Sequence, residues 1–324
     1  MATLFLDRKD LELRIDGATV AIYEPAGRRG TVPLHLLDRV VMQGRVKLDT
    51  GVLTKLAELG IATLLLSARH SRRLAIVLGA GHNQAAIRLA QSRRVFDQDW
   101  CAGWAARQVG AKLRTQSLLL TEALLARPDA RKPLTDALAE IAAIAQQLGS
   151  VPAEPTRLLG FEGAAARSYF AGLAALLPPS LGFVGRNRRP PRDPVNACLS
   201  LGYTLLHFDA VRACHGAGLD PLLGFYHRPS FGRESLACDL IEPLRARIDL
   251  MAWQLFRDRS LRAEHFSNDQ GACLLGKAGR GIFFQRYEQQ AAPARRALRR
   301  QCRILARHFT AEGEPLLGHD DEAL

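Results

Sequence analysis

Hydrophobic and polar residues alternate with the period of a β-strand over the first part of the chain. Residues 11–15 and 18–23 both alternate, and the Asp16-Gly17 pair between them is typical of a two-residue hairpin turn. A helix is expected over residues 51–59, ended by Gly60. Short apolar runs predict further strands over residues 31–37, 39–42, 61–66 and 74–78. We therefore expect residues 1–78 to form a small β-rich domain, a sheet or a sandwich.

The hydrophobic period becomes helical from about residue 84. Ala, Leu, Gln and Arg dominate residues 84–127 and 134–148, which Pro128 and Pro133 separate. Later helices are expected over 156–169, 195–217, 234–256 with a kink or restart at Pro243, and 294–309. Residues 79–84 are then a linker between the β-rich domain and a helical domain of residues 85–324. The pattern predicts an α+β protein.

Charge and composition narrow the class of partner. The 324 residues carry a formal net charge of +12, and arginine, which grips phosphates through paired donors, contributes most of the positive charge. Polyanions are therefore the expected partners. The chain has neither an 18-residue apolar run nor a signal-peptide pattern at its start, so we expect a cytoplasmic protein without a membrane partner. Six cysteines without a CxxC pair are expected to be reduced thiols.

One motif resembles a nucleotide site but lacks its context. Residues 271–277 have the glycine and lysine spacing of a P-loop, yet Ala278 lacks the hydroxyl that would hold Mg²⁺. No apolar strand is predicted to lead into Gly271, so we expect no P-loop. HExxH and GxSxG motifs are also absent from the sequence, so nothing in it supports a metalloprotease or a hydrolase fold.

Carboxylates and a histidine in the helical part are candidates for chemistry. Glu162 lies in an apolar setting beside Gly163, and His227 ends the largely apolar run 218–227. Asp239 and Glu242, three residues apart, are expected on one helical face. Two carboxylates and an imidazole suit Mg²⁺ or Mn²⁺, and zinc is not excluded by these ligands. The alternatives are structural: a hydrogen-bonded core histidine, and Glu242 paired with Arg245 or Arg247.

Four motifs, in order, resemble the CRISPR-associated adaptation integrase family: LLGFEG (158–163), NRRPPRDPVNACLSLGYTLL (187–206), GLDPLLGFYH (218–227) and SLACDLIEPLR (235–245). The resemblance implies a small N-terminal β-sandwich domain followed by a larger, mostly α-helical catalytic domain, assembled as a homodimer. It implies that Glu162, His227 and Glu242 hold a divalent metal, Mg²⁺ or Mn²⁺, and that Asp239 supports the site or replaces a ligand. Asp193 and Asn196 are helix-capping types, for which we expect a structural role.

The activity implied by this resemblance is DNA endonuclease and integrase chemistry. A 3′-hydroxyl of a short duplex would attack a phosphodiester of repeat DNA, and a small companion protein would bridge two homodimers. Arginines that flank the motifs are candidates for phosphate contacts: Arg186, Arg188, Arg189, Arg192, Arg245 and Arg247. Two alternatives stay open, namely a metal-dependent nuclease of DNA repair or mobile-element transfer, and a DNA-binding scaffold without catalysis.

Overall fold

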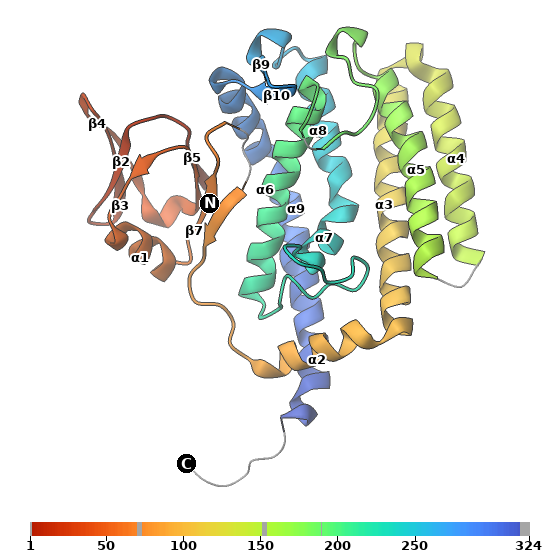
Figure 1. The fold of residues 1–324 in the computed structure, drawn as a ribbon, viewed down its shortest axis with the longest axis horizontal. Helices are drawn as coiled ribbons and strands as arrows, with labels where there is room; N and C mark the ends of the chain where they lie inside the picture. The colour runs from red at the N-terminus through yellow and green to blue at the C-terminus, as the bar shows by residue number, and fades with distance from the viewer. Residues whose placement is uncertain (1, 70–72, 151–153, 189, 318–324) are drawn as a thin grey trace. The chain divides into compact units, whose positions relative to one another are not determined.

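The computed structural model describes residues 2–69, 73–150, 154–188 and 190–317 (Figure 1). The chain divides into two compact units, one built from Met1–His82 and Gly276–Gln289, the other from Asn83–Leu275 and Gln290–Leu324. The first is rich in strands and the second is mostly helical. This arrangement confirms the predicted α+β class, with a β-rich N-terminal part and a larger helical part.

The described strands of the first unit form two four-stranded sheets. One sheet contains parallel strands and an antiparallel edge strand, in the order β1 (Ala2–Leu6), β5 (Leu37–Gln43), β7 (Ala62–Leu66) and β8 (Arg73–Val77). The other has the order β4 (Gly27–Pro33), β3 (Thr19–Glu24), β2 (Leu11–Asp16) and β6 (Val46–Lys47). Leucines and valines of both sheets pack with helix α1 (Thr50–Glu58) in one hydrophobic core.

Local sequence explains where these strands begin and end. Strands β2 and β3 pair from Glu12 opposite Tyr23 to Asp16 opposite Thr19, and Gly17 takes a left-handed φ of 57°, which confirms the hairpin. The expectation of one strand over residues 31–37 is wrong. Strand β4 ends at Pro33 and the 3₁₀ turn η1 (Leu34–Leu36) precedes β5, because proline cannot donate to the next ladder position.

Eight helices longer than one 3₁₀ turn follow in the part of the chain described after residue 82. They are α2 (Ala85–Phe96), α3 (Gln98–Ala126), α4 (Arg131–Ser150), α5 (Pro155–Ala175), α6 (Pro194–Gly216), α7 (Ser235–Ile241), α8 (Arg245–Arg257) and α9 (Lys277–Gly313). Helices α3, α4 and α5 lie side by side (Figure 1). Among the described helices, none is both long and apolar enough to cross a bilayer.

Two caps and one proline set the helix boundaries near the site. Asp97 accepts from the Trp100 N–H at 2.9 Å and starts α3 directly after α2, so the predicted run 84–127 forms two helices. Asp193 caps α6 through the Asn196 N–H at 2.8 Å, which confirms its structural role. Pro243 separates α7 from α8 through the 3₁₀ turn η4 (Glu242–Leu244), as the sequence predicted.

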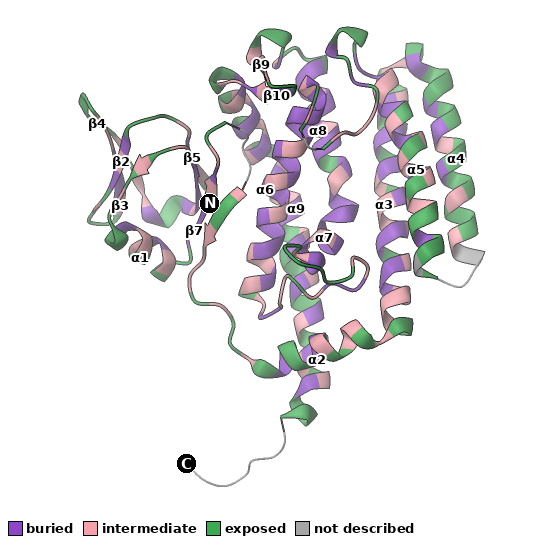
Figure 2. Cartoon of the chain, in the orientation of Figure 1, coloured by how far each residue is buried: buried purple, intermediate pink, exposed green. Residues whose placement is uncertain are grey.

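Helix α6 is the centre of the helical unit. Buried side chains extend along its whole length, whereas the outer face of α4 is exposed (Figure 2). Leu199, Leu206 and Phe208 on α6 have no exposed surface. A helix that is apolar on nearly every side can only be stable when it is surrounded, so α6 fixes the helices around it.

The motif at 271–277 begins in the turn of a hairpin and contains its second strand, and it is not a phosphate-binding loop. Strands β9 (Phe266–Asp269) and β10 (Ala272–Leu275) pair antiparallel, and Gln270 and Gly271 take positive φ angles in the turn. A strand does precede Gly271, but β9 is mostly polar, so the expectation that no apolar strand leads into this glycine holds. After Gly271 the chain continues as strand β10 and not as a glycine-rich loop. This segment is therefore not a P-loop.

Candidate functional site

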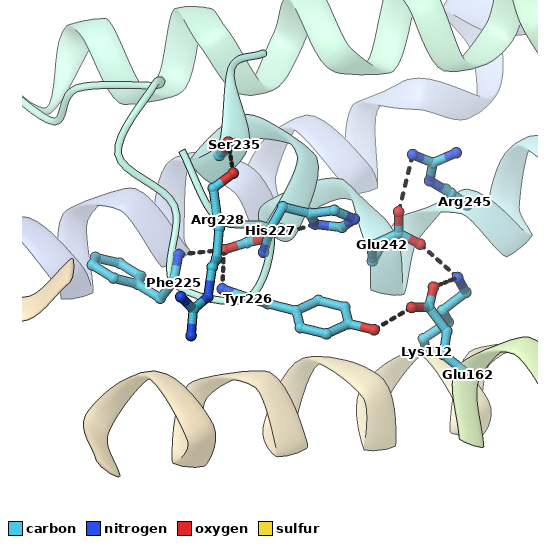
Figure 3. A network of polar contacts seen from close by, with 10 residues as sticks. Lys112, Glu162, Phe225, Tyr226, His227, Arg228, Ser235, Glu242 and Arg245 are labelled. Carbon is cyan, nitrogen blue, oxygen red and sulfur yellow. Dashed lines mark hydrogen bonds and ion pairs between the residues drawn. The ribbon is translucent and has the colours of Figure 1, made fainter. Parts of the chain in front are cut away.

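Two acidic side chains from separate helices meet at one lysine. Glu162 lies on α5, Glu242 begins η4, and Lys112 lies on α3. The Lys112 ammonium donates to Glu162 Oε1, and to Glu242 Oε2 at 2.7 Å (Figure 3). All three side chains are largely buried. The structure thus brings together two of the carboxylates singled out in the sequence, around a cation that the sequence analysis did not name.

The charges in this cluster stabilise one another. Burial alone would raise the pKa of Glu242, but Arg245 and Lys112 outweigh it and lower this pKa to about 2. Arg245 Nη2 lies 3.0 Å from Glu242 Oε1. Burial would lower the pKa of Lys112, but the charges of Glu242 and Glu162 raise it. Both Glu242 and Lys112 are therefore ionised at neutral pH. The pairing of Glu242 with Arg245, foreseen as an alternative, does occur.

Asp239 holds His227 and the loop before it. The carboxylate is completely buried and accepts from the N–H groups of Phe225 at 2.8 Å, Tyr226 at 2.9 Å and His227 at 2.8 Å. Its Oδ1 also lies 2.8 Å from Nδ1 of the His227 ring. A carboxylate at Nδ1 favours the tautomer with the proton there, which leaves the Nε2 lone pair available as a ligand or base. The ring points toward Glu242 (Figure 3).

Tyr226 connects this loop to the carboxylates. Its hydroxyl donates to Glu162 Oε2, and burial together with the Glu162 charge raises the tyrosine pKa. The loop approaches α7 closely at Gly224, where an added Cβ would lie 2.5 Å from the carbonyl carbon of Ser235. Only glycine permits this approach, so Gly224 helps to set the positions of Tyr226 and His227.

Lys112 and Tyr226 are the site residues that the sequence reasoning missed. Tyr226 contacts Glu162, whereas Tyr203 is buried and donates to Asp249. A usable indication existed for Lys112, since Ala105, Val109 and Leu119 share its helical face and are buried. A lysine on an apolar face requires a partner, although the sequence alone does not name it.

The structure divides the arginines that were grouped as phosphate contacts. Arg186 donates to Asn196 Oδ1 at 2.7 Å and lies over the Tyr203 ring, and Arg245 is paired with Glu242. Their guanidinium groups are thus engaged within the protein. Arg188, Arg192 and Arg247 are exposed, and Arg189 lies outside the described residues. Phosphate binding stays a prediction for this group.

The carboxylate oxygens and the imidazole nitrogen of this site are atom types that bind divalent ions. Within the described residues, no group of three His, Cys, Asp or Glu side chains is already arranged as an ion site. Glu162 and Glu242 nevertheless share one positive charge, the Lys112 ammonium, in a buried position. Two carboxylates on a shared cation, beside an imidazole whose Nε2 is available, form a donor set suited to Mg²⁺ or Mn²⁺.

Comparisons with known proteins identify one family and solved structures of similar fold. A curated relative from Thermodesulfovibrio yellowstonii, named CRISPR-associated endonuclease Cas1 1, is 36% identical over 98% of this chain and all of its own length. A casposase bound to an integration product matches with a TM-score of 0.83 and 21% identity, over 97% of this chain and 92% of its own. A Cas6-RT-Cas1–Cas2 complex matches with a TM-score of 0.78 and 21% identity, over all of this chain and 36% of its own. The sequence profile of the family described as CRISPR associated protein Cas1 matches residues 4–289, and the chain therefore belongs to the Cas1 family.

Proposed function

We propose that the chain is a divalent-metal-dependent DNA endonuclease and integrase of the cytoplasm, which inserts short DNA duplexes into repeat DNA. The observation that carries this proposal is the convergence of Glu162 and Glu242 on one buried cation, beside the oriented imidazole of His227. The net charge of +12 supports a nucleic-acid partner. The endonuclease name of the relative and the integration product held by the casposase support the reaction class.

Glu162, Glu242 and His227 would hold Mg²⁺ or Mn²⁺, while Asp239 keeps the imidazole in the required tautomer. The ion, when bound, supplies positive charge against the phosphoryl oxygens of the scissile phosphodiester. Arg245 keeps Glu242 ionised and Tyr226 orients Glu162 through its hydroxyl. The Lys112 ammonium, which donates to both carboxylates, would compete with the ion for their oxygens.

The two outcomes of the reaction differ in the nucleophile. A 3′-hydroxyl of a short duplex exchanges one phosphodiester for another, and water gives hydrolysis instead. The chain works as a homodimer with a small companion protein that bridges two dimers. The Cas6-RT-Cas1–Cas2 complex among the structural matches supports a companion protein as partner. Exposed arginines, Arg188, Arg192 and Arg247, contact phosphates.

The test compares Glu242→Gln and Glu162→Gln with Glu122→Gln, a matched change at an exposed glutamate of α3. One assay follows nicking of supercoiled plasmid and a second follows joining of a labelled 3′-hydroxyl duplex into it, each with Mn²⁺, Mg²⁺ or a chelator. The two site variants should lose activity by roughly 100-fold, and the Glu122 variant should lose none.

The outcomes separate the three functions. Metal-dependent cutting without joining would indicate a nuclease of repair or mobile-element transfer. DNA binding without any metal-dependent reaction would indicate a scaffold. If Glu242→Gln keeps both activities within twofold of the unaltered protein, the assignment of the site is wrong.

A further inference from the structure

The loop between His227 and α7 carries an aromatic side chain fully into solvent. Phe231 is completely exposed, and every residue from Arg228 to Arg233 is exposed as well. A turn holds this tip, since the Arg233 N–H donates to the Ser230 carbonyl at 3.1 Å and Gly232 takes a left-handed φ of 70°. A phenylalanine gains free energy by leaving water, so a phenylalanine fixed at a turned tip is suited to a surface that it meets only on binding.

The start of this loop is anchored to α7 by two side chains. Asp239 accepts from the backbone of residues 225–227, and the Ser235 hydroxyl donates to the Arg228 carbonyl at 3.2 Å (Figure 3). The four Cα-to-Cα steps from His227 to Phe231 span at most about 14 Å. Phe231 is therefore tied to the candidate site and lies within a few nucleotides of any phosphodiester that reacts there.

The flanking charges favour a nucleic acid over an apolar partner. Arg228 and Arg233 are exposed on both sides of Phe231, and the chain as a whole carries +12. Guanidinium groups bind phosphates in pairs of hydrogen bonds, and a phenyl ring stacks on the face of a base. A single ring between two arginines offers little apolar area for a protein interface, whose centre is depleted of charge.

Stacking further specifies the form of the DNA. Bases within a duplex have both faces covered by their neighbours, so an unpaired base can place a face on a side chain without the cost of unstacking. Resting on the proposed function, we infer that Phe231 stacks on an unpaired base next to the reacting phosphodiester, with Arg228 and Arg233 on the adjoining phosphates. The loop is a contact for single-stranded DNA that positions the strand at the site.

The experiment measures binding of a labelled thymidine oligonucleotide and of a duplex by fluorescence anisotropy, with chelator present so that neither is cut. Phe231→Ala is compared with Phe96→Ala, the same change at another exposed phenylalanine, which ends α2. Phe231→Ala should bind the oligonucleotide roughly tenfold more weakly than Phe96→Ala. Its duplex affinity and its salt dependence should be unchanged. Arg228→Gln with Arg233→Gln should instead flatten the salt dependence.

A positive signature comes from Phe231→Trp, which should keep the affinity and show quenching of the indole fluorescence by the oligonucleotide. Equal affinities of Phe231→Ala and Phe96→Ala for the oligonucleotide, or an equal loss on duplex, would overturn the inference. An unaltered protein that binds only duplex would overturn it as well. The proposed function fails on a different result, namely the loss of metal-dependent cutting and joining in the unaltered protein.

Discussion

Replacing Lys112 by methionine should destabilise the helical unit, because it removes the cation that Glu162 and Glu242 share. The two carboxylates would then face each other across a site from which most water is excluded. Breaking a fully buried ion pair costs about 3–5 kcal/mol. The Lys112 and Glu162 side chains retain 12% and 17% of their exposure, and Arg245 and Tyr226 still contact the carboxylates. The expected loss is therefore at the lower end, about 3 kcal/mol.

Thermal unfolding in the presence of chelator measures this loss, and the midpoint should fall by roughly 6 °C or more. Lys132→Met is the matched control, because the Lys132 side chain is 86% exposed and its pair with Asp136 at 2.9 Å is on the surface. The control should stay within about 0.5 kcal/mol of the unaltered protein. Added Mn²⁺ should raise the midpoint more in Lys112→Met, since the ion no longer competes with the ammonium. Equal midpoints for the two variants would refute the view that Lys112 balances the cluster.

Two further predictions concern groups around the site. Burial raises the pKa of Asp249 from 3.8 to about 6 despite hydrogen bonds from Tyr203 and Tyr169, so the folded state favours its protonated form. The protonated carboxyl therefore stabilises the fold fully below pH 3.8, and about 3 kcal/mol of this stabilisation is lost as the pH rises to about 6. Urea unfolding should show this fall in the free energy of unfolding, and Asp249→Asn should make the dependence on pH flatter. Gly224→Ala would place a Cβ 2.5 Å from the backbone of Ser235, and neither backbone segment can move away easily. It should lower stability by about 1–3 kcal/mol and reduce plasmid nicking, whereas Gly216→Ala, with nothing within 4 Å of its Cβ, should do neither.

Local chemistry made much of the fold predictable. The Asp16-Gly17 turn, the cap at Asp193 and the break at Pro243 each depend on residues adjacent in sequence, and each is found as expected. Strand β1 was not predicted, because its five residues become a strand by pairing with β5, which lies more than thirty residues away. The hairpin β9–β10 is also short and mostly polar on its first strand, so tertiary contacts decide it.

The site was predictable in its acids and histidine but not in its cation. Motif resemblance directed attention to Glu162, His227 and Glu242, and the structure places the two glutamates on Lys112 and turns His227 toward Glu242. The sequence separation of Lys112 from Glu242 is 130 residues, and only the packing of α3 against η4 brings them together. Their joint role as metal ligands stays a prediction.

The anchoring of His227 has a consequence for how this protein can diverge. Because Asp239 fixes the imidazole and its backbone from α7, the position of the ring does not depend on the residues that follow it in the loop. The tip at 229–233 can therefore change in length or sequence while the reactive groups stay in register. The preference for a DNA strand and the reaction at the site can then change separately. Exchange of residues 229–233 between relatives should transfer that preference without loss of catalysis.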